Sequence, residues 1–432
     1  MPLLYRLLYN LAAYLAAPVV SAVFLWRGIR DHAWWRNFTE RFGFGPPQIP
    51  AGVWLHAASV GEVQACAPLV SALYRRHPGV PLTVTTFTPT GAARARALFG
   101  NLAQVRYLPY DLPGAVRRFF RRVQPRLAVI FETELWPNLY RECGRRRVPL
   151  VLASARVSVR SAGRYRRLGA LFSGALSHAA VVAAQGEADA ERFRALGADP
   201  GSTHVTGNLK FDFELPLEIA ARGARLRAQY APEAPLWVAG STHSGEETAA
   251  LAAHRMVRGH DAQALLVLAP RHPARFAAVA LELEACGMPW ACRSETPGTA
   301  EGTTMPAIAV LLLDSLGELL DFYAAADLAF VGGSLVPVGG HNLLEPAALG
   351  LPILTGPHNF NAAEVARLLT SRGAARVVHD ADELGTEVRA LLADRSARAA
   401  LGALARASVD SNRGALARLL ALIEPLLESA DG

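Results

Sequence analysis

Short apolar runs alternate with longer amphipathic stretches along the chain from residue 53 onward. The runs have the length of strands, and the stretches between them repeat apolar residues at helical spacing, for example over 62–76 and 115–124. The runs in the first half that we predict as strands are 53–58, 82–88, 105–110, 127–132, 148–154 and 180–184. Strands that alternate with helices predict a parallel sheet with helices on both faces.

The alternation stops over 213–235, a polar stretch that contains proline, and then starts again. The second series of predicted strands is 236–240, 264–270, 310–314, 328–332, 352–354 and 376–379, followed by helices over 383–392 and 415–427. We therefore expect two Rossmann-like α/β domains, 31–212 and 236–432, joined by a linker over 213–235. They should face a cleft, with ligands at the carboxyl ends of the strands. One arrangement packs the last helix back onto the first domain.

Residues 7–26 carry no charged side chain and are bounded by arginines at both ends. A helix of this length can just span a bilayer, but Asn10 and Pro18 fit a helix lying in the membrane surface nearly as well, so both arrangements stay open. Arginines are more frequent after the segment than before it, and the positive-inside rule then leaves the rest of the chain in the cytoplasm. We expect residues 1–30 to be a membrane anchor.

Composition narrows the class of protein. With 51% hydrophobic residues the chain of 432 residues is not largely disordered, and one long uncharged apolar run excludes a polytopic membrane protein. The net charge of +7 is unevenly spread: residues 1–205 hold 26 arginines against 11 acidic residues, whereas residues 206–432 hold 18 basic against 26 acidic residues. A basic domain attracts phosphates, on lipid headgroups or on nucleic acid. Four cysteines without a CxxC pair indicate reduced thiols.

The turn Ser59-Val-Gly-Glu62 follows the first predicted strand. Its local sequence favours a capping box, with Ser59 as the N-cap and Glu62 three residues into the helix. The end of a parallel strand is also where an α/β sheet binds ligands, so Glu62 fits a general base as well. The helix terminus would hold the pKa of Glu62 low, and an active base would need partial desolvation to offset this.

Two further features of the first domain point to chemistry. Glu132 and Glu134 end the fourth predicted strand; Glu134 fits a cap of the next helix, whereas Glu132 is still on the strand, where an acid is costly to bury without a role. Lys210 is the single lysine among 44 basic residues. Codon bias explains the missing lysines but not this one, and a compact cation here could neutralise a phosphate or a developing charge.

The second domain holds three turns suited to phosphate, over 240–247, 269–273 and 332–346. Their glycines should expose backbone N–H groups, helix N-termini favour anions, and Arg271 can add bidentate contacts. Glu345 is placed to accept hydrogen bonds from a ribose, and Leu316-Gly317-Glu318 either caps a helix or contacts the base. No P-loop, GxGxxG or HExxH pattern occurs, which argues against the usual NTPase, an NAD enzyme and a metal site.

Several strings of the sequence together are similar to one family. They are SVGE (59–62), TTFTPTG (85–91), YLPYD (107–111), ETELWPN (132–138), GNLKFD (207–212), GSTHSGEE (240–247), PRHP (270–273) and FVGGSLVPVGGHNLLEPAALG (330–350). In this order, and over nearly the whole chain, they resemble the 3-deoxy-D-manno-octulosonic acid (Kdo) transferases of Gram-negative bacteria.

The resemblance implies a GT-B glycosyltransferase that moves Kdo, with inversion, from CMP-Kdo onto the phosphorylated lipid A precursor lipid IVA in lipopolysaccharide biosynthesis. The first domain would bind the acceptor and the second the CMP-sugar. The enzyme would work at the cytoplasmic side of the inner membrane, against an anionic membrane surface, with no cofactor, no metal and no nucleic acid.

The resemblance also implies roles for individual residues. Glu62 would be the general base, and Glu132 and Lys210 would stabilise the transition state. The residues implied to contact CMP are Pro270, Arg271, Leu316, Gly317, Glu318, Asn342, Leu343, Leu344 and Glu345. Further donor contacts are expected from Ser241, Thr242, His243, Gly339 and Gly340.

Two other functions compete with this one. A GT-B sugar-nucleotide epimerase, or a transferase that uses a UDP-sugar, shares the two-domain design but would not need the membrane segment or the basic first half. An arginine-rich protein that binds nucleic acid or anionic membranes should interleave its basic residues with stacking aromatics on one face. Arginines surround Phe119 and Phe120 in the run 117–122, but the helical spacing predicts that both phenylalanines face the core.

Overall fold

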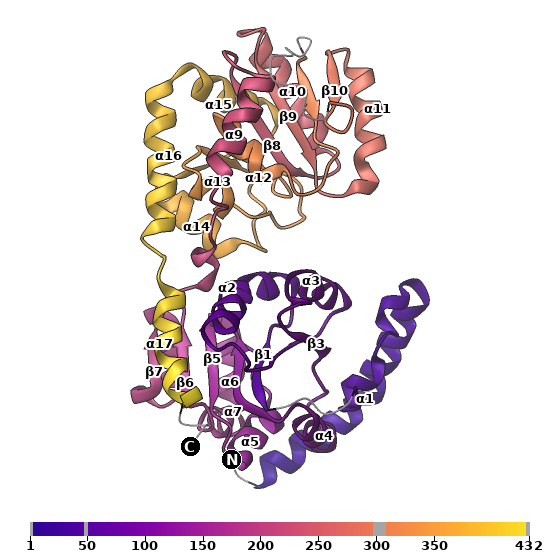
Figure 1. Ribbon diagram of the computed structural model, residues 1–432, viewed down its shortest axis with the longest axis vertical. Coiled ribbons are helices and arrows are strands. Elements are labelled where there is room, and N and C mark those ends of the chain that lie inside the picture. Colours follow the sequence, from indigo (N-terminus) through magenta and orange to yellow (C-terminus); the bar gives the residue numbers. More distant parts are fainter. Residues whose placement is uncertain (1–2, 47–50, 297–307, 429–432) are drawn as a thin grey trace. The chain divides into compact units, whose positions relative to one another are not determined.

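The computed structural model describes residues 3–46, 51–296 and 308–428 (Figure 1). The chain divides into two compact units, unit 1 with Met1–Phe213 and Asn412–Gly432, and unit 2 with Glu214–Ser411. Each unit is built on a seven-stranded sheet whose paired strands are all parallel. The prediction of two Rossmann-like α/β domains with an apolar N-terminal helix is therefore confirmed.

The sheet of unit 1 has the strand order β3-β2-β1-β4-β5-β6-β7. Its strands are β1 (Gly52–His56), β2 (Leu82–Thr86), β3 (Gln104–Tyr107), β4 (Pro125–Phe131), β5 (Leu150–Ala155), β6 (Val181–Ala184) and β7 (Thr203–Val205). The order reverses between β1 and β4, and the crevice at such a switch point is where open α/β sheets bind ligands. The sequence pattern missed β7, because its three residues include no buried apolar side chain.

Helices cover both faces of this sheet. One face carries α2 (Val60–Arg76), α3 (Pro89–Phe99) and α17 (Ala415–Glu428); the other carries α4 (Pro113–Val123), α5 (Pro137–Arg146), α7 (Gly169–Leu176) and α8 (Glu187–Ala195), with α6 (Val159–Arg167) beside α7. Because side chains alternate along a strand, Val53 and Leu55 face the first layer and Trp54 the second. Phe119 and Phe120 are buried against Trp54, as the helical spacing predicts.

The last helix packs back onto unit 1, as one of the predicted arrangements has it, so the end of the predicted second domain belongs to unit 1. α17 buries Leu419, Leu420 and Ile423 in the core of unit 1. The predicted linker contains α9 (Ile219–Tyr230), which packs in unit 2 against α12 (Leu319–Ala325). A Cβ at Gly223 would lie 2.6 Å from the Cβ of Ala324, so the glycine permits α9 to pack closely on α12. The polar composition of this stretch had predicted a linker instead.

The sheet of unit 2 has the order β10-β11-β9-β8-β12-β13-β14. Its strands are β8 (Leu236–Thr242), β9 (Leu265–Pro270), β10 (Trp290–Cys292), β11 (Val310–Leu312), β12 (Leu328–Val331), β13 (Ile353–Thr355) and β14 (Ala375–Val377). The order reverses between β8 and β12, which gives unit 2 a switch point in the place that corresponds to β1 and β4 in unit 1.

The helices of unit 2 again form two layers. α10 (Glu246–Arg258), α11 (Phe276–Cys286) and α15 (Ala381–Ala393) pack on one face, and α9 and α12 on the other. Unit 2 also contains α13 (Leu344–Ala348), α14 (Ala363–Ser371), α16 (Arg395–Asp410) and the short 3-10 helix η5 (Pro273–Arg275). The other 3-10 helices belong to unit 1: η1 (His32–Trp34), η2 (Phe38–Phe42), η3 (Pro200–Ser202) and η4 (Leu209–Asp212).

The N-terminal helix α1 (Leu3–Arg30) is long and apolar enough to cross a membrane, judged by length and composition. It lies along unit 1 (Figure 1). Near its start, the Tyr9 hydroxyl donates to Asp111 Oδ2 at 2.8 Å, and the Asn138 amide donates to Asn10 Oδ1 at 2.8 Å. Polar groups in an apolar helix thus find partners in the folded unit rather than in a bilayer.

The other end of α1 is held by aromatic contacts. Phe24 is buried, its ring centroid lies 5.8 Å from that of Phe87, and the guanidinium of Arg41 lies 4.6 Å from the Phe24 ring. Residues at a spacing of three or four along α1 form this docked stripe: Ala13, Ala17, Val20 and Phe24. The apolar side chains of α1 that stay exposed include Leu4, Leu7, Leu8, Leu11, Leu15, Val19 and Ile29.

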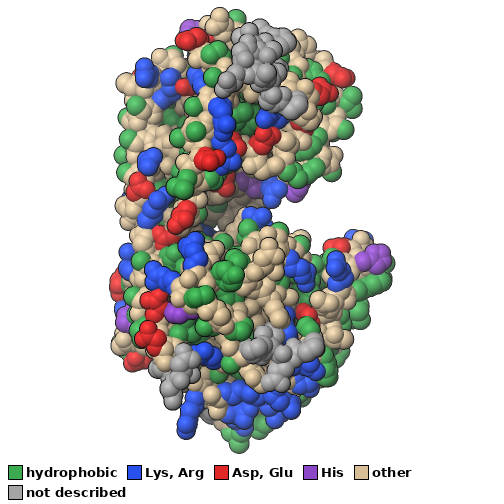
Figure 2. Space-filling view, viewed as in Figure 1, with side chains coloured by type: hydrophobic (Ala, Val, Ile, Leu, Met, Phe, Trp, Pro, Cys, Tyr) green, Lys and Arg blue, Asp and Glu red, His purple; other side chains and the backbone are tan. Residues whose placement is uncertain are grey.

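Arginine side chains gather on the part of unit 1 that carries α4 and α5 (Figure 2). Both helices end in arginines, Arg121 and Arg122 in α4 and Arg145 and Arg146 in α5. The surplus of basic residues in the first half of the sequence is therefore partly concentrated on one surface.

Candidate active site

The capping box predicted at the start of α2 is confirmed. Ser59 is the N-cap, and its hydroxyl oxygen accepts the N–H of Glu62 at 3.3 Å. The Glu62 carboxylate reaches back, so that Oε1 accepts the Ser59 hydroxyl at 2.9 Å and Oε2 accepts the N–H of Ala58 at 2.8 Å. The carboxylate is thereby fixed at the carboxyl end of β1, beside the switch point of the sheet.

The environment of Glu62 gives it the proton affinity of a general base. Burial raises its pKa to about 7, and the negative charge of Glu132 adds to the rise; the hydrogen bonds from Ala58 and Ser59 oppose it. The rise in the pKa caused by desolvation therefore outweighs the lowering expected from the helix terminus. This is what the sequence required of Glu62 if it is to act as a base. A carboxylate with a pKa near neutrality can accept a proton and release it again at physiological pH.

Glu132 occupies a strained turn between two cations. It is the first residue after β4 rather than its last, as the sequence predicted, and its φ of 55° lies in the left-handed region that costs a residue with a Cβ about 1 kcal/mol or more. Its Oε1 lies 3.1 Å from Lys210 Nζ, and its Oε2 lies 3.4 Å from Arg156 Nε. The turn takes Glu132 out of the strand and places its carboxylate between Lys210 and Arg156.

Glu134 does not cap the next helix, so that prediction was wrong. Its Oε2 accepts the indole N–H of Trp136 at 2.8 Å, and burial raises its pKa. The first N–H groups of α5 instead donate to the buried Asp111, at 2.9 Å from Asn138 and 2.8 Å from Leu139. Asp111 lies just before α4, which packs against α5, and from there its carboxylate takes the capping place.

Lys210 is held by a segment that is fixed on both sides. Its backbone N–H donates to Asn208 Oδ1 at 3.0 Å, and its neighbours Leu209 and Phe211 are buried. Asp212 Oδ1 accepts the N–H of Gly414 at 2.6 Å, which ties the segment to the chain entering α17. The lone lysine thus projects from a rigid loop toward Glu132, and the returning last helix supports that loop.

Unit 2 brings most of the predicted donor residues to the carboxyl edge of its own sheet. A Cβ at Gly240 would lie 2.1 Å from the hydroxyl of Tyr323, so only glycine fits where β8 meets α12. Ser241 follows with a φ of 57°. The Arg271 N–H donates to Thr242 O at 3.0 Å, which joins the end of β9 to the end of β8, and the Arg271 side chain is exposed.

Histidines from three loops meet at this edge. His243 Nε2 and His341 Nε2 are 2.8 Å apart and share a hydrogen bond, and their rings are stacked, with centroids 5.1 Å apart and planes at 6°. The ring of His272 lies edge-on to His243 at 5.4 Å. Burial lowers the pKa of His341 to about 4 and also lowers the pKa of His243, so the pair is neutral at neutral pH.

The glycine-rich loop after β12 does not expose its amides as the sequence predicted. The N–H groups of Gly333, Ser334 and Leu335 donate to the buried carboxylate of Glu246, and those of Gly339 and Gly340 both donate to Gly333 O. The loop closes on itself and on α10, because an acidic side chain at the start of α10 occupies the position that a bound anion would take.

The other predicted CMP contacts in unit 2 differ in their exposure and in their hydrogen bonds. Leu316 is exposed and Gly317 has a φ of 91°; Glu318 is the N-cap of α12, and its Oε1 accepts a hydrogen bond from Arg293 Nη2 at 2.8 Å. Burial alone would raise the pKa of Glu318, but the hydrogen bonds from Arg293 and Ser315 hold it below its usual value.

At the start of α13, the Asn342 amide donates to Glu345 Oε1 at 3.0 Å, and Asn342 is exposed. Leu343 and Leu344 are buried, so only their backbone atoms face the loop. The Pro270 side chain is buried at the end of β9 in the same way.

Sequence reasoning missed two charged residues of these sites. Arg156 follows β5, the neighbour of β4, so the order of the strands could have placed it beside Glu132. Glu246 looks from the sequence like an ordinary acid in a first helical turn, because three of its four partners lie 87 to 89 residues further along the chain. Among the described residues, no group of three or more His, Cys, Asp or Glu side chains is arranged to hold a metal ion.

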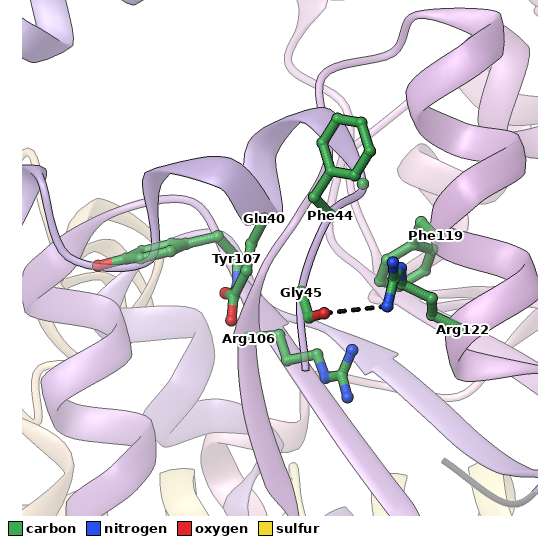
Figure 3. Close-up of a pocket in the computed structure, with 8 residues that line it drawn as sticks. Glu40, Phe44, Gly45, Arg106, Tyr107, Phe119 and Arg122 are labelled. Carbon is green, nitrogen blue, oxygen red and sulfur yellow. Dashed lines mark hydrogen bonds between the residues drawn. The ribbon is translucent and has the colours of Figure 1, made fainter. Parts of the chain in front are cut away.

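Two hollows on the described surface involve none of these residues. One lies between η2, β3 and α4, where Glu40, Arg106 and Arg122 surround a space of about 10 Å³, room for a single water (Figure 3). The other, of about 500 Å³, lies beside Pro235 and His260, which precede β8 and β9, at the edge opposite the donor residues.

Comparison with known proteins identifies the family. Residues 36–213 match the family model described as "3-Deoxy-D-manno-octulosonic-acid transferase (kdotransferase)". The chain is 39% identical over 431 residues to the 3-deoxy-D-manno-octulosonic acid transferase of Haemophilus influenzae, covering 98% of this chain and 99% of that one. It is 38% identical over 440 residues to the enzyme of the same name from Bordetella pertussis, with the same coverage.

A solved structure, that of a putative UDP-N-acetylglucosamine 2-epimerase from Listeria monocytogenes, is similar in fold with a TM-score of 0.56 over 88% of this chain and 98% of that one, at 17% identity. This likeness bears on the fold alone, which is of the GT-B type. The sequence relationship, which extends over nearly the whole chain, is specific, and by it this chain belongs to the family of Kdo transferases, which are glycosyltransferases.

Proposed function

We propose that this protein transfers Kdo, with inversion, from CMP-Kdo to a hydroxyl of the phosphorylated lipid A precursor lipid IVA. The observation that carries the proposal is Glu62, a carboxylate with a pKa of about 7 at the switch point of the first sheet, beside the Glu132–Lys210 pair. Unit 1 would bind the acceptor and supply the base. Unit 2 would bind the donor.

The reaction needs one base and a stabilised leaving group. Glu62 takes the proton of the acceptor hydroxyl as the hydroxyl oxygen bonds to the anomeric carbon of Kdo, on the face opposite the phosphate. The bond from that carbon to the phosphate oxygen breaks, and its electron pair leaves with CMP. Because the attack and the departure occur on opposite faces, the configuration inverts.

Charges must be balanced while this bond breaks. The sugar becomes cationic and the departing phosphate gains negative charge. In the pair of Glu132 and Lys210, the carboxylate would stabilise the sugar and the ammonium would stabilise the phosphate. Such groups act strongly because they are fixed before the reaction begins, and the strained turn at Glu132 and the rigid loop of Lys210 supply that rigidity.

The donor site would use groups of unit 2. Arg271 is exposed and suited to hold a phosphate, and Asn342 and Glu345 present polar atoms for the nucleoside. We propose that these groups hold the donor without a metal ion, since an arginine and hydrogen-bond donors can carry the charge of a single phosphate.

We propose that α1 lies in the surface of the inner membrane, with the folded units in the cytoplasm. Tyr9 near one end and Phe24 near the other are both held by unit 1, which supports a helix along the unit rather than across a bilayer. Its exposed leucines suit the acyl boundary, and the arginines of α4 and α5 suit anionic headgroups. A protein docked in this way would meet a lipid acceptor within the membrane.

The decisive experiment is an assay of the purified full chain in detergent with CMP-Kdo and a tetra-acylated disaccharide lipid A precursor. We expect Kdo to be joined to the lipid with inverted anomeric configuration, which NMR of the product reads out, and the rate to be unaffected by EDTA. Binding of CMP without transfer would contradict the acceptor. A rate that EDTA abolishes would contradict the metal-free mechanism.

The arrangement of α1 has its own test. With an epitope added before Met1, protease applied to inverted inner-membrane vesicles should remove the epitope, because a helix in the surface leaves its N-terminus on the cytoplasmic side. Protection of the epitope would mean that α1 spans the membrane. A second epitope after Gly432 controls for vesicle orientation.

A further inference from the structure

A buried carboxylate in unit 2 takes no part in the mechanism above. Glu246 is the first residue of α10, and its side chain is fully buried. It makes no ion pair with any residue of the described chain. An isolated charge is costly to bury unless hydrogen bonds replace its hydration, so its partners should explain why it is there.

All partners of Glu246 are backbone N–H groups. Oε2 accepts from His243 at 2.9 Å and from Gly333 at 2.6 Å, and Oε1 accepts from Ser334 and Leu335, each at 2.9 Å. A carboxylate has about four lone-pair sites, so this one is saturated. Successive amides that converge on one point form a nest for an anion, and here the chain supplies the anion itself.

The same carboxylate joins the two loops at the switch point of the second sheet. His243 belongs to the loop after β8, and Gly333, Ser334 and Leu335 belong to the loop after β12. The ring of His341 lies over Gly333, where a Cβ would be 2.8 Å from its Cδ2. The backbone that Glu246 holds therefore carries one ring of the His243–His341 pair and supports the other.

The histidine pair contains a hydrogen-bond donor that the pair itself does not use. In a neutral pair joined through Nε2 and Nε2, one ring donates and the other accepts. The accepting ring must then carry its proton on Nδ1. Neither Nδ1 has a hydrogen-bond partner among the described residues, so this N–H is left to donate to a ligand at the strand edge to which Arg271 also belongs.

We propose that Glu246 is a positioning residue of the donor site: its carboxylate fills the anion nest of the glycine-rich loop and thereby fixes the His243–His341 pair, which donates a hydrogen bond to an acidic group of the donor. The inference rests on the proposed function for the identity of that donor. It predicts that the nest itself binds no phosphate, because Glu246 already fills it.

Glu246→Gln tests the proposal with little change in shape. The amide places N–H groups against backbone N–H groups, so about half of the hydrogen bonds are lost. We expect the KM for CMP-Kdo to rise roughly tenfold to hundredfold, while the KM for the acceptor, which unit 1 would bind, stays unchanged. A merely structural role would lower the folded fraction, reduce the apparent kcat and leave both KM values unchanged.

Glu247→Gln is the matched control. Glu247 is the next residue and is equally buried, but it pairs with Arg275, whose Nε lies 3.1 Å from Oε1 and whose Nη2 lies 3.2 Å from Oε2. The amide oxygen can still accept the Thr242 hydroxyl, and only the pair with Arg275 is weakened. We expect a lower melting temperature and unchanged KM values.

Glu246→Ala provides a second variant in case the glutamine does not fold. Alanine empties the nest, and added formate should refill it and lower the donor KM again, whereas formate should leave the donor KM of Glu247→Ala unchanged. An unchanged donor KM in Glu246→Gln, or a raised donor KM in Glu246→Ala that formate does not lower, overturns the proposal.

These results are separable from the proposed function. If the wild type transfers Kdo and the Glu246 variants keep its donor KM, the positioning role fails and the function stands. If the wild type does not transfer Kdo, the proposed function fails, and calorimetry with CMP decides the positioning role instead. A lower affinity for CMP in Glu246→Gln but not in Glu247→Gln would support it, and equal affinities would overturn it.

Discussion

In each unit, the strand at the switch point of the sheet is followed by a helix whose first turn carries a buried or half-buried glutamate. Glu62 follows β1, and Glu246 follows β8. The two differ in their surroundings. Glu62 accepts one hydrogen bond from a backbone N–H and one from the Ser59 hydroxyl, and it lies near the negative charge of Glu132. Glu246 accepts four backbone N–H groups.

This difference in surroundings suits one glutamate to proton transfer and the other to a structural role. Burial raises the pKa of Glu62, the negative charge of Glu132 adds to the rise, and this carboxylate can exchange a proton. A carboxylate saturated by four amides has no acceptor site left for a substrate and acts as a fixed part of the fold. The same residue type at the same topological place therefore serves two purposes, and the two carboxylates differ in their number of N–H donors and in the charge beside them.

The largest effect is expected when Glu62 loses its ability to take a proton. Glu62→Gln should lower kcat by about 10²- to 10⁴-fold, the usual contribution of a general base, while CMP binding by unit 2 stays intact. Steady-state kinetics and calorimetry measure the two. Ser59→Ala is the control, because it removes the other half of the capping box and should cost about 1 kcal/mol of stability with a much smaller loss of kcat. Near-normal turnover of Glu62→Gln would leave Glu62 with its capping role alone.

Arg271→Ala should act on the other unit and on another parameter. Loss of a charged hydrogen bond to phosphate should raise the KM for CMP-Kdo roughly tenfold to hundredfold. The KM for the acceptor and the pH profile, which depend on unit 1, should not move. A shift of the pH profile in this variant would break the division of labour between the units.

Lys210→Arg should impair turnover although the charge is kept. A planar guanidinium cannot occupy the place of a compact ammonium 3.1 Å from Glu132, and we expect kcat to fall roughly tenfold. The reverse exchange, Arg76→Lys in the exposed pair with Glu424, should have no effect on kcat and controls for exchanging one cation for another beside a carboxylate. If Lys210→Arg turns over like the wild type, the single lysine of the chain is an accident of composition.

The pH dependence gives the smallest and most specific effect. Because the base must be ionised, kcat should rise with pH through about 7, the pKa of Glu62. In Glu132→Gln, whatever activity remains should show its inflection at lower pH, since a negative charge that raises this pKa is gone. An inflection that does not move would mean that Glu132 does not act on Glu62 electrostatically.

The stability of the fold should also depend on the pKa of Glu62, but it should fall with rising pH where kcat rises. The folded chain holds the Glu62 proton more tightly than the unfolded chain, so this contribution to stability is present at low pH and is lost as pH rises from about 4.5 to about 7. The melting temperature of Glu62→Gln should therefore exceed that of the wild type more at pH 8 than at pH 5. A difference that is constant with pH would contradict the raised pKa.

The sequence by itself determined the two sheets and the places of most site residues. Parallel strands are buried on both faces, so they are apolar runs that stand out from the helices between them, and the motifs that follow such runs must lie at one edge of the sheet. That was enough to put Glu62 and Arg271 at strand ends, whereas Lys210 was placed only where the first domain meets the linker, because β7, the strand before it, was not predicted. Short strands such as β7 and β10, with three residues each, carry too little pattern to be found.

Only the tertiary structure decided how these residues behave. The proton affinity of Glu62 depends on burial and on Glu132, and the loop of Lys210 depends on the chain that returns after unit 2. Three of the four amides that satisfy Glu246 lie 87 to 89 residues away. Patterns of neighbouring residues encode local structure, because side-chain periodicity is local. Desolvation, charge and hydrogen bonding are set by groups that meet only when the chain has folded.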